Sequence, residues 1–107
     1  ILGHPTGRLL MRRPEYALNL EAIIEAAIAN KVALEINASP SRLDLGPEIV
    51  KHAREKGAMI SINTDAHSVE NLDRMWLGIN VAKRSWLNKE NVINTFTLNE
   101  FQKWKQR

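Results

Sequence analysis

VALEIN, residues 32–37, is the stretch that decides how this chain folds. Successive side chains of a strand point to opposite faces, so this stretch has one aliphatic face and one polar face. AMISINT, residues 58–64, repeats the pattern. The residues expected on the polar faces are Glu35, Asn37, Ser61, Asn63 and, if the second strand stays extended, Asp65. Because a parallel sheet with helices on both sides is apolar on both faces, we expect helices to cover only the aliphatic face.

Helical patterns surround these two strands. Residues 19–30 place apolar side chains three and four positions apart, with Asn19 as the N-cap. A second helix is expected to begin at Pro47 and to stop before Gly57, since proline suits the first helical turn and glycine the position after the last. The alternation of strand and helix predicts an α/β fold built from parallel βα units.

Three more helices are expected after the second strand. Ser68 is the predicted cap of a helix that carries apolar residues from 72 to 82. A short helix is expected near residues 89–94, directly after Asn88. A hydrophobic staple, formed by one apolar residue on each side of Asn88, would mark its start. A capping box that begins at Thr97 starts the last helix, at about residues 98–106.

The segment from Ile1 to His4 resembles the end of a strand whose beginning precedes the chain. Three strands are too few to close a barrel. We therefore expect residues 1–107 to be the C-terminal part of one larger α/β domain. An open sheet edge beside Ile1 would favour self-association of the isolated piece.

Composition excludes several classes of protein. The chain has 107 residues, a net charge of +3 and no cysteine, which excludes a disulfide framework and thiolate metal sites and fits a cytoplasmic protein. Its apolar runs are short and its first residues do not form a signal peptide, so no membrane association is expected. The charge is too small to name nucleic acid as a partner, although Arg8, Arg12 and Arg13 form an acid-free basic cluster.

Two strand ends carry residues that bind metal. His4 follows the first strand, and Asp65 and His67 follow the strand at 58–64. The carboxyl ends of parallel strands are where α/β enzymes place their sites, and mixed nitrogen and oxygen donors suit Zn²⁺, Mn²⁺ or Fe²⁺. Asp65 alternatively caps the helix near Ser68, and His4 alternatively is a loop histidine. His52 lies in the middle of a helix and is interpreted as a surface residue.

Four further polar residues are candidate catalytic groups. Arg8 and Arg42 each follow a strand end, where a guanidinium group can hold a phosphate with two hydrogen bonds. The alternatives are ion pairs, of Arg42 with Asp44 or of Arg8 with Glu35. Glu35 and Asn37 either orient a ligand histidine or form a structural hydrogen-bonded pair.

Three blocks of sequence resemble the closing motifs of the polymerase and histidinol phosphatase (PHP) family. They are GHPTGR at residues 3–8, LEINASPSRLD at residues 34–44 and INTDAHS at residues 62–68. Together with Trp86-Leu87 and Asn94-Thr95, these three blocks are most similar in sequence to the PHP domain of bacterial and archaeal family X DNA polymerases. The resemblance extends from Ile1 to the last helix.

This resemblance implies a distorted seven-stranded βα barrel, similar to a TIM barrel, with several metal ions at its C-terminal rim. His4, Asp65 and His67 match metal ligands of the family. The implied activity is phosphoester hydrolysis, as a 3′–5′ exonuclease that processes DNA 3′ ends during repair synthesis, commonly with Mn²⁺, beside upstream polymerase domains. The basic loop 8–13 would contact the DNA backbone.

The family's remaining ligands, an early His-x-His pair, a further histidine and a glutamate, are not in this chain. We therefore expect these 107 residues alone to bind metal weakly and to leave phosphoesters intact. Two other functions stay open. One is a phosphatase of the histidinol phosphatase type, acting on small phosphate monoesters; the other is a PHP scaffold of a polymerase that has lost its catalytic activity.

Overall fold

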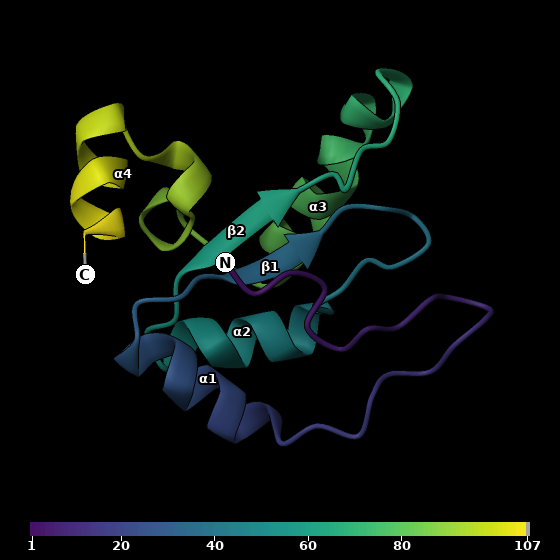
Figure 1. Ribbon diagram of the computed structural model, residues 1–107, viewed down its shortest axis with the longest axis horizontal. Helices are drawn as coiled ribbons and strands as arrows, with labels where there is room; N and C mark the ends of the chain where they lie inside the picture. The colour runs from purple at the N-terminus through teal and green to yellow at the C-terminus, as the bar shows by residue number, and fades with distance from the viewer. Residues whose placement is uncertain (107) are drawn as a thin grey trace.

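In the described part of the chain, the sheet has two parallel strands, β1 (Leu34–Asn37) and β2 (Ile60–Asn63). A computed structural model describes residues 1–106 and places both strands at the centre of the molecule (Figure 1). Leu34 lies opposite Ile60, and Asn37 lies opposite Asn63. Both strands and their parallel pairing confirm the predicted α/β fold class.

Single bridges extend the sheet on both sides. Leu2 pairs in parallel with Leu34 at the outer edge of β1, where its N–H donates to the carbonyl of Ala33 over 2.9 Å. Val92 pairs in parallel with Ile60 at the outer edge of β2. The sheet is therefore ordered as the chain is, from the first residues through β1 and β2 to Val92. Residues 1–106 form an open sheet, and the barrel stays a prediction.

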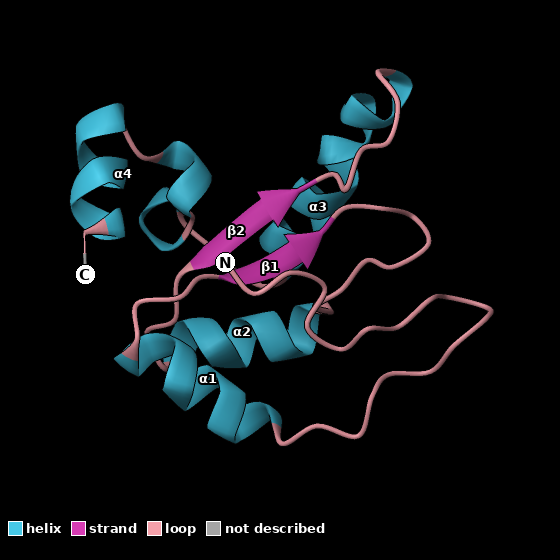
Figure 2. Ribbon diagram, viewed as in Figure 1, coloured by secondary structure: helices cyan, strands magenta, loops and turns pink. Residues whose placement is uncertain are grey.

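Four α-helices accompany the sheet, and their positions agree with the sequence pattern (Figure 2). They are α1 (Leu20–Ala29), α2 (Pro47–Glu55), α3 (Met75–Arg84) and α4 (Leu98–Lys105). The side chain of Asn19 accepts a hydrogen bond from the N–H of Ala22, and Thr97 and Glu100 form the predicted capping box. Within residues 1–106, none of the helices has the length and apolar character needed to cross a membrane.

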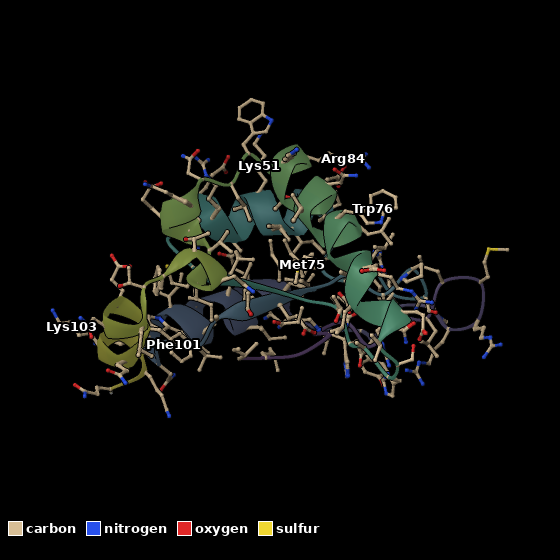
Figure 3. All side chains as sticks on the ribbon, turned by 90° about the horizontal axis from the view of Figure 1, so that it is seen from above. Lys51, Met75, Trp76, Arg84, Phe101 and Lys103 are labelled. Atoms are coloured by element: carbon tan, nitrogen blue, oxygen red, sulfur yellow. The ribbon has the colours of Figure 1, made fainter. Side chains whose placement is uncertain are left out.

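Ser68 does not cap a helix, which corrects one prediction. The N–H of Asn71 bonds to the backbone carbonyl of Ser68, and a 3-10 helix (Glu70–Arg74) precedes α3. The buried face of α3 also differs from the expected apolar stripe. Met75 packs against the core, whereas Trp76 lies on the outer side of the helix (Figure 3).

The short helix expected near residues 89–94 is two 3-10 helices, Lys89–Asn91 and Ile93–Thr95. Val92 separates them because it takes an extended conformation in order to pair with Ile60. Beside it, the side-chain amide of Asn94 accepts from the N–H of Ile62 over 2.8 Å and donates to the carbonyl of Ile62 over 2.7 Å. Pairing with the edge of β2 therefore prevents a continuous α-helix here.

The hydrophobic core lies against the aliphatic face of the sheet. Its centre is formed by the side chains of Leu34, Ile36 and Ile60, which are almost completely buried. Helices α1, α2 and α3 supply the residues that cover them, among them Ile24, Val50, Ala53, Val81 and Ala82. Burial of one large aliphatic side chain stabilises a fold by about 1.5–3 kcal/mol, so this face fixes how the sheet and helices pack.

A charged cluster joins the exposed sides of α1 and α2. Glu21 contacts Lys56, and its Oε2 lies 2.7 Å from Nε2 of His52. Lys56 also reaches Glu25 over 3.5 Å. The position of His52 at the surface confirms its interpretation. Hydrogen bonds from Lys56 and then His52 lower the pKa of Glu21, and the bond to Glu21 raises the pKa of Lys56.

We expect the substitution Glu21→Gln to lower the melting temperature near neutral pH but not in strong acid. The stabilisation linked to Glu21 is present above its ordinary pKa of 4.5 and is lost as the pH falls through the lowered pKa of the folded state. For Lys56, the contribution is present below its ordinary pKa of 10.5 and is lost as the pH rises through its raised pKa. Thermal unfolding at several pH values would measure this, with Glu25→Gln as the control expected to change less. An equal difference at every pH would contradict the linkage.

Candidate functional site

The polar residues of both strands share one face, as predicted. Glu35 and Asn37 of β1 lie in register with Ser61 and Asn63 of β2. Glu35 is only 7% exposed and Asn37 only 1%. A buried carboxylate or amide destabilises the fold unless its polar atoms have partners, so this face must be hydrogen-bonded.

Glu35 is the acceptor that joins these groups. Its Oε2 accepts from the backbone N–H of His4 over 2.6 Å and from Nδ2 of Asn37 over 3.3 Å. Its Oε1 accepts from Nδ2 of Asn63 over 2.8 Å. The carboxylate of Glu35 therefore holds the backbone of His4 against both strands. Glu35 and Asn37 thus form the hydrogen-bonded pair of one alternative, while the bond to His4 fixes the segment that carries a predicted ligand, so an orienting role for Glu35 stays a prediction.

Asp65 continues the same chain of contacts. Its Oδ2 lies 3.1 Å from Nδ2 of Asn37 and 3.7 Å from Nε of Arg42. Arg42 thus pairs with Asp65, not with Asp44 as one alternative had it. These partners hold the carboxylate of Asp65 at the end of β2. Asp65 does not cap a helix near Ser68, where the backbone forms a turn.

His67 extends from the end of β2 into solvent, with 82% of its side chain exposed. Its Nδ1 lies 2.7 Å from the carbonyl oxygen of Asp65 and 3.9 Å from Oδ1 of the same residue. A neutral imidazole that donates from Nδ1 keeps its lone pair on Nε2, which is the atom that would then bind a metal ion.

His4 begins loop 4–8, which follows the bridge at Leu2 and lies at the carboxyl ends of the strands; this end of the sheet is here called the rim, and the loop the rim loop. His4 has a φ of 27° and an exposed side chain. Its carbonyl accepts from the N–H of Gly7 over 2.9 Å, which closes a tight turn. Among residues 1–106, no three histidine, aspartate or glutamate side chains converge closely enough to hold a metal ion. The ligand set His4, Asp65 and His67 therefore stays a prediction. Its donors, two imidazoles and a carboxylate, fit Mn²⁺, Zn²⁺ or Fe²⁺ by their chemistry.

Arg8 and Arg42 join two loops at this edge of the sheet. Nε of Arg8 donates to the carbonyl of Arg42 over 2.7 Å, and its Nη2 donates to the carbonyl of Leu43. Nη1 of Arg42 donates to the carbonyl of Arg8 over 3.3 Å. The ion-pair partner of Arg8 is Glu15, at 3.3 Å, and not Glu35, the partner given as an alternative. In this structure two of the three guanidinium nitrogens of Arg8 donate to backbone carbonyls, whereas Arg42 faces Asp65.

Asp44 is a residue of the site that the sequence pattern did not single out. It is completely buried, and its Oδ2 accepts from the N–H of Thr6 over 3.0 Å. Its carbonyl accepts from the N–H of Asn37 over 2.5 Å, while Leu45 donates to the carbonyl of Glu35. Asp44 therefore ties the rim loop to the outer edge of β1. The alternation of apolar and acidic residues in Leu43-Asp44-Leu45, which is typical of an edge strand, is the sequence pattern that would have indicated the pairing of Asp44 with β1.

Comparison with known proteins gives the following relatives, although no protein-family model matches the chain. Over all 107 residues it is 42% identical to the DNA polymerase/3'-5' exonuclease PolX of Bacillus subtilis, and it spans 19% of that protein's length. It is also 26% identical, over 91% of its length, to probable phosphatases of Vibrio parahaemolyticus and Aliivibrio fischeri, and covers 40% of each. The predicted resemblance to a polymerase-associated exonuclease is confirmed, and the phosphatases are weaker relatives.

Proposed function

We propose that this chain is the C-terminal part of a PHP domain in a longer family X DNA polymerase, and that the complete domain removes nucleotides from DNA 3′ ends. The observation that carries the proposal is the 42% identity over the whole chain to a protein named as a polymerase and 3'-5' exonuclease. The polar face supports it, because it connects the backbone of His4 to the carboxylate of Asp65 through Glu35 and Asn37.

His4, Asp65 and His67 would hold divalent metal ions, with Mn²⁺ or Zn²⁺ preferred and Fe²⁺ acceptable to the same donors. Bound metal supplies an activated water and neutralises charge on the phosphate. Glu35 holds His4 in place, and Asn37 orients the carboxylate of Asp65. Arg42 keeps positive charge beside Asp65, where a phosphate oxygen would lie.

The sheet supports the proposed barrel. Leu2 and Val92 pair in parallel at the two outer edges, and Asp44 forms a single antiparallel bridge with Asn37 at the end of the β1 edge. Parallel strands could therefore be added through the segments that carry Leu2 and Val92. The chain spans about a fifth of the polymerase relative, which leaves ample sequence for the remaining strands and ligands. We propose that these come from the longer protein.

The probable phosphatases favour a second candidate, a phosphatase that acts on small phosphate monoesters. Such an enzyme encloses its substrate in a pocket, whereas an exonuclease must leave room for a polymer. Hydrolysis of an oligonucleotide 3′ end and of a small phosphate monoester by the full-length protein would separate the two candidates.

Replacement of His67 with alanine in the full-length protein tests the metal centre. We expect at least about a 100-fold loss of 3′–5′ exonuclease rate in Mn²⁺ and fewer metal ions per chain, because an imidazole ligand is removed. Nucleotide incorporation should stay within about twofold. The matched control is His52→Ala, since His52 is an exposed histidine of α2 that pairs with Glu21. Exonuclease activity and metal content equal to those of the control would contradict the proposal.

A further inference from the structure

Residues 9–13 form a small closed loop, here called the tip loop, at the edge of the molecule. Leu9 and Arg13 pair with each other through two backbone hydrogen bonds of 3.0 and 2.8 Å. Figure 1 shows this purple segment as the part that extends farthest from the sheet and helices on its side. Met11 occupies the turn of the loop and is fully exposed, and Leu10 beside it is 40% exposed.

Met11 is an unfavourable residue for this position if the fold alone is considered. Its φ of 66° lies in the left-handed region, where a residue other than glycine is strained. Its side chain buries nothing against the rest of the chain. The left-handed backbone at Met11 opposes stability, and a function for this position would account for it.

The loop is held firmly in its outward position. The N–H of Leu10 donates to the carbonyl of Ser41 over 2.7 Å. Nε of Arg13 donates to the carbonyl of Gly7 over 2.9 Å, and its guanidinium group lies 5.6 Å from the ring centre of Tyr16. Ser41 precedes Arg42, the partner of Asp65, so the tip loop stands on the same rim as the candidate site.

Charge indicates what the tip loop would meet. Arg12 and Arg13 follow Met11 directly in an exposed stretch, and residues 1–14 contain no acidic side chain. A cation beside phosphate and an apolar side chain between bases is the combination by which proteins unstack nucleic acids, and methionine and leucine are among the side chains inserted. A purely apolar protein partner would not require the arginines.

We propose that Met11 is a wedge that unstacks the terminal base pair of a DNA duplex, while Arg12 and Arg13 contact the flanking phosphates. This inference rests on the proposed exonuclease function and adds a substrate preference to it. The wedge opens the end of a duplex so that the 3′ strand reaches the rim. It matters for duplex ends and not for single strands, which have no terminal pair to open.

The test uses Met11→Gly in the full-length protein. Glycine relieves the left-handed strain, so the variant should fold at least as well while it lacks the wedge. We expect its 3′–5′ degradation of a blunt duplex to fall about tenfold, with that of the same strand in single-stranded form within about twofold. Met11→Leu, which keeps an apolar tip, should retain most of the duplex activity. Leu98→Ala, which truncates another exposed apolar side chain, should equal the wild type.

A binding measurement separates this inference from the function on which it rests. In the background Asp65→Asn, without added metal, a duplex with 2-aminopurine in its 3′-terminal pair should brighten when bound, and Met11→Gly should abolish the increase. Equal duplex rates and equal fluorescence for Met11→Gly and wild type would overturn the wedge and leave a protein partner for the tip loop. Absence of any DNA degradation by the wild type would instead overturn the proposed function.

Discussion

Replacement of Glu35 with alanine is expected to cost about 3 kcal/mol of unfolding free energy. Its carboxylate accepts hydrogen bonds from the backbone N–H of His4 and from the amides of Asn37 and Asn63. Truncation leaves the N–H of His4 and the amide of Asn63 without this acceptor in a partly buried place, whereas Asn37 keeps Asp65 as an acceptor, and each unpaired buried group costs about 1–3 kcal/mol. Urea denaturation, monitored by circular dichroism, would measure the loss.

Two further variants isolate the cause. Glu35→Gln keeps the volume but turns one acceptor into a donor, so its loss should be smaller than that of Glu35→Ala and still clear. Glu55→Ala, on the exposed surface of α2, should change the unfolding free energy by less than about 0.5 kcal/mol. A Glu35→Ala protein as stable as the Glu55→Ala control would show that the carboxylate does not hold His4. In the full-length protein, the same substitution should lower exonuclease activity about 10- to 100-fold.

Replacement of Gly78 with valine is expected to be about as damaging, for the opposite reason. Gly78 lies in α3 where the helix meets the end of β2, and a Cβ atom there would stand 2.5 Å from Cγ2 of Ile62 and 3.0 Å from Cβ of Ala38. Helix and sheet would have to separate, and overpacking of a core typically costs about 1–3 kcal/mol. Because Asn63 and Asp65 follow Ile62, we also expect weaker exonuclease activity in the full-length protein.

The control for Gly78→Val is Asn80→Val, at an exposed position of the same helix. It tests valine in α3 without the contact, and should change stability by less than about 0.5 kcal/mol. Addition of Ile62→Ala to Gly78→Val should recover part of the loss, because it removes the atom that the new side chain meets. If the double variant is no more stable than Gly78→Val alone, the close approach is not the cause.

Local sequence patterns were enough to predict the strands and helices that depend on residues close to one another in the sequence. Alternation in residues 32–37 and 58–64 predicted both strands and their polar faces, and the structure adds the register between them. The caps at Asn19 and Thr97 predicted where α1 and α4 begin. The break at Val92 could not be predicted in this way, because it depends on pairing with Ile60, which is distant in sequence.

The residues of the candidate site also differ in how well the sequence predicts their positions. Glu35 and Asn37 were expected on one face because their strand fixes where they point. Asp65 follows β2 with a φ of 53° instead of continuing the extended chain, and it still accepts a hydrogen bond from Asn37. Loop residues were less predictable. Arg42 pairs with Asp65 and not with its near neighbour Asp44, since the loop turns Asp44 inward to Thr6. The convergence of His4, Asp65 and His67 on a metal ion stays a prediction.

The order of the sheet, from Leu2 through β1 and β2 to Val92, has a consequence for how the chain is made. Each strand after the first emerges from the ribosome when a neighbour with which it pairs has already been synthesised. Loop closure between successive strands then spans a few tens of residues at most, which keeps its entropic cost low. Such a unit can assemble stepwise during translation, and a pause between strands would leave a partly built sheet with the next edge ready to pair.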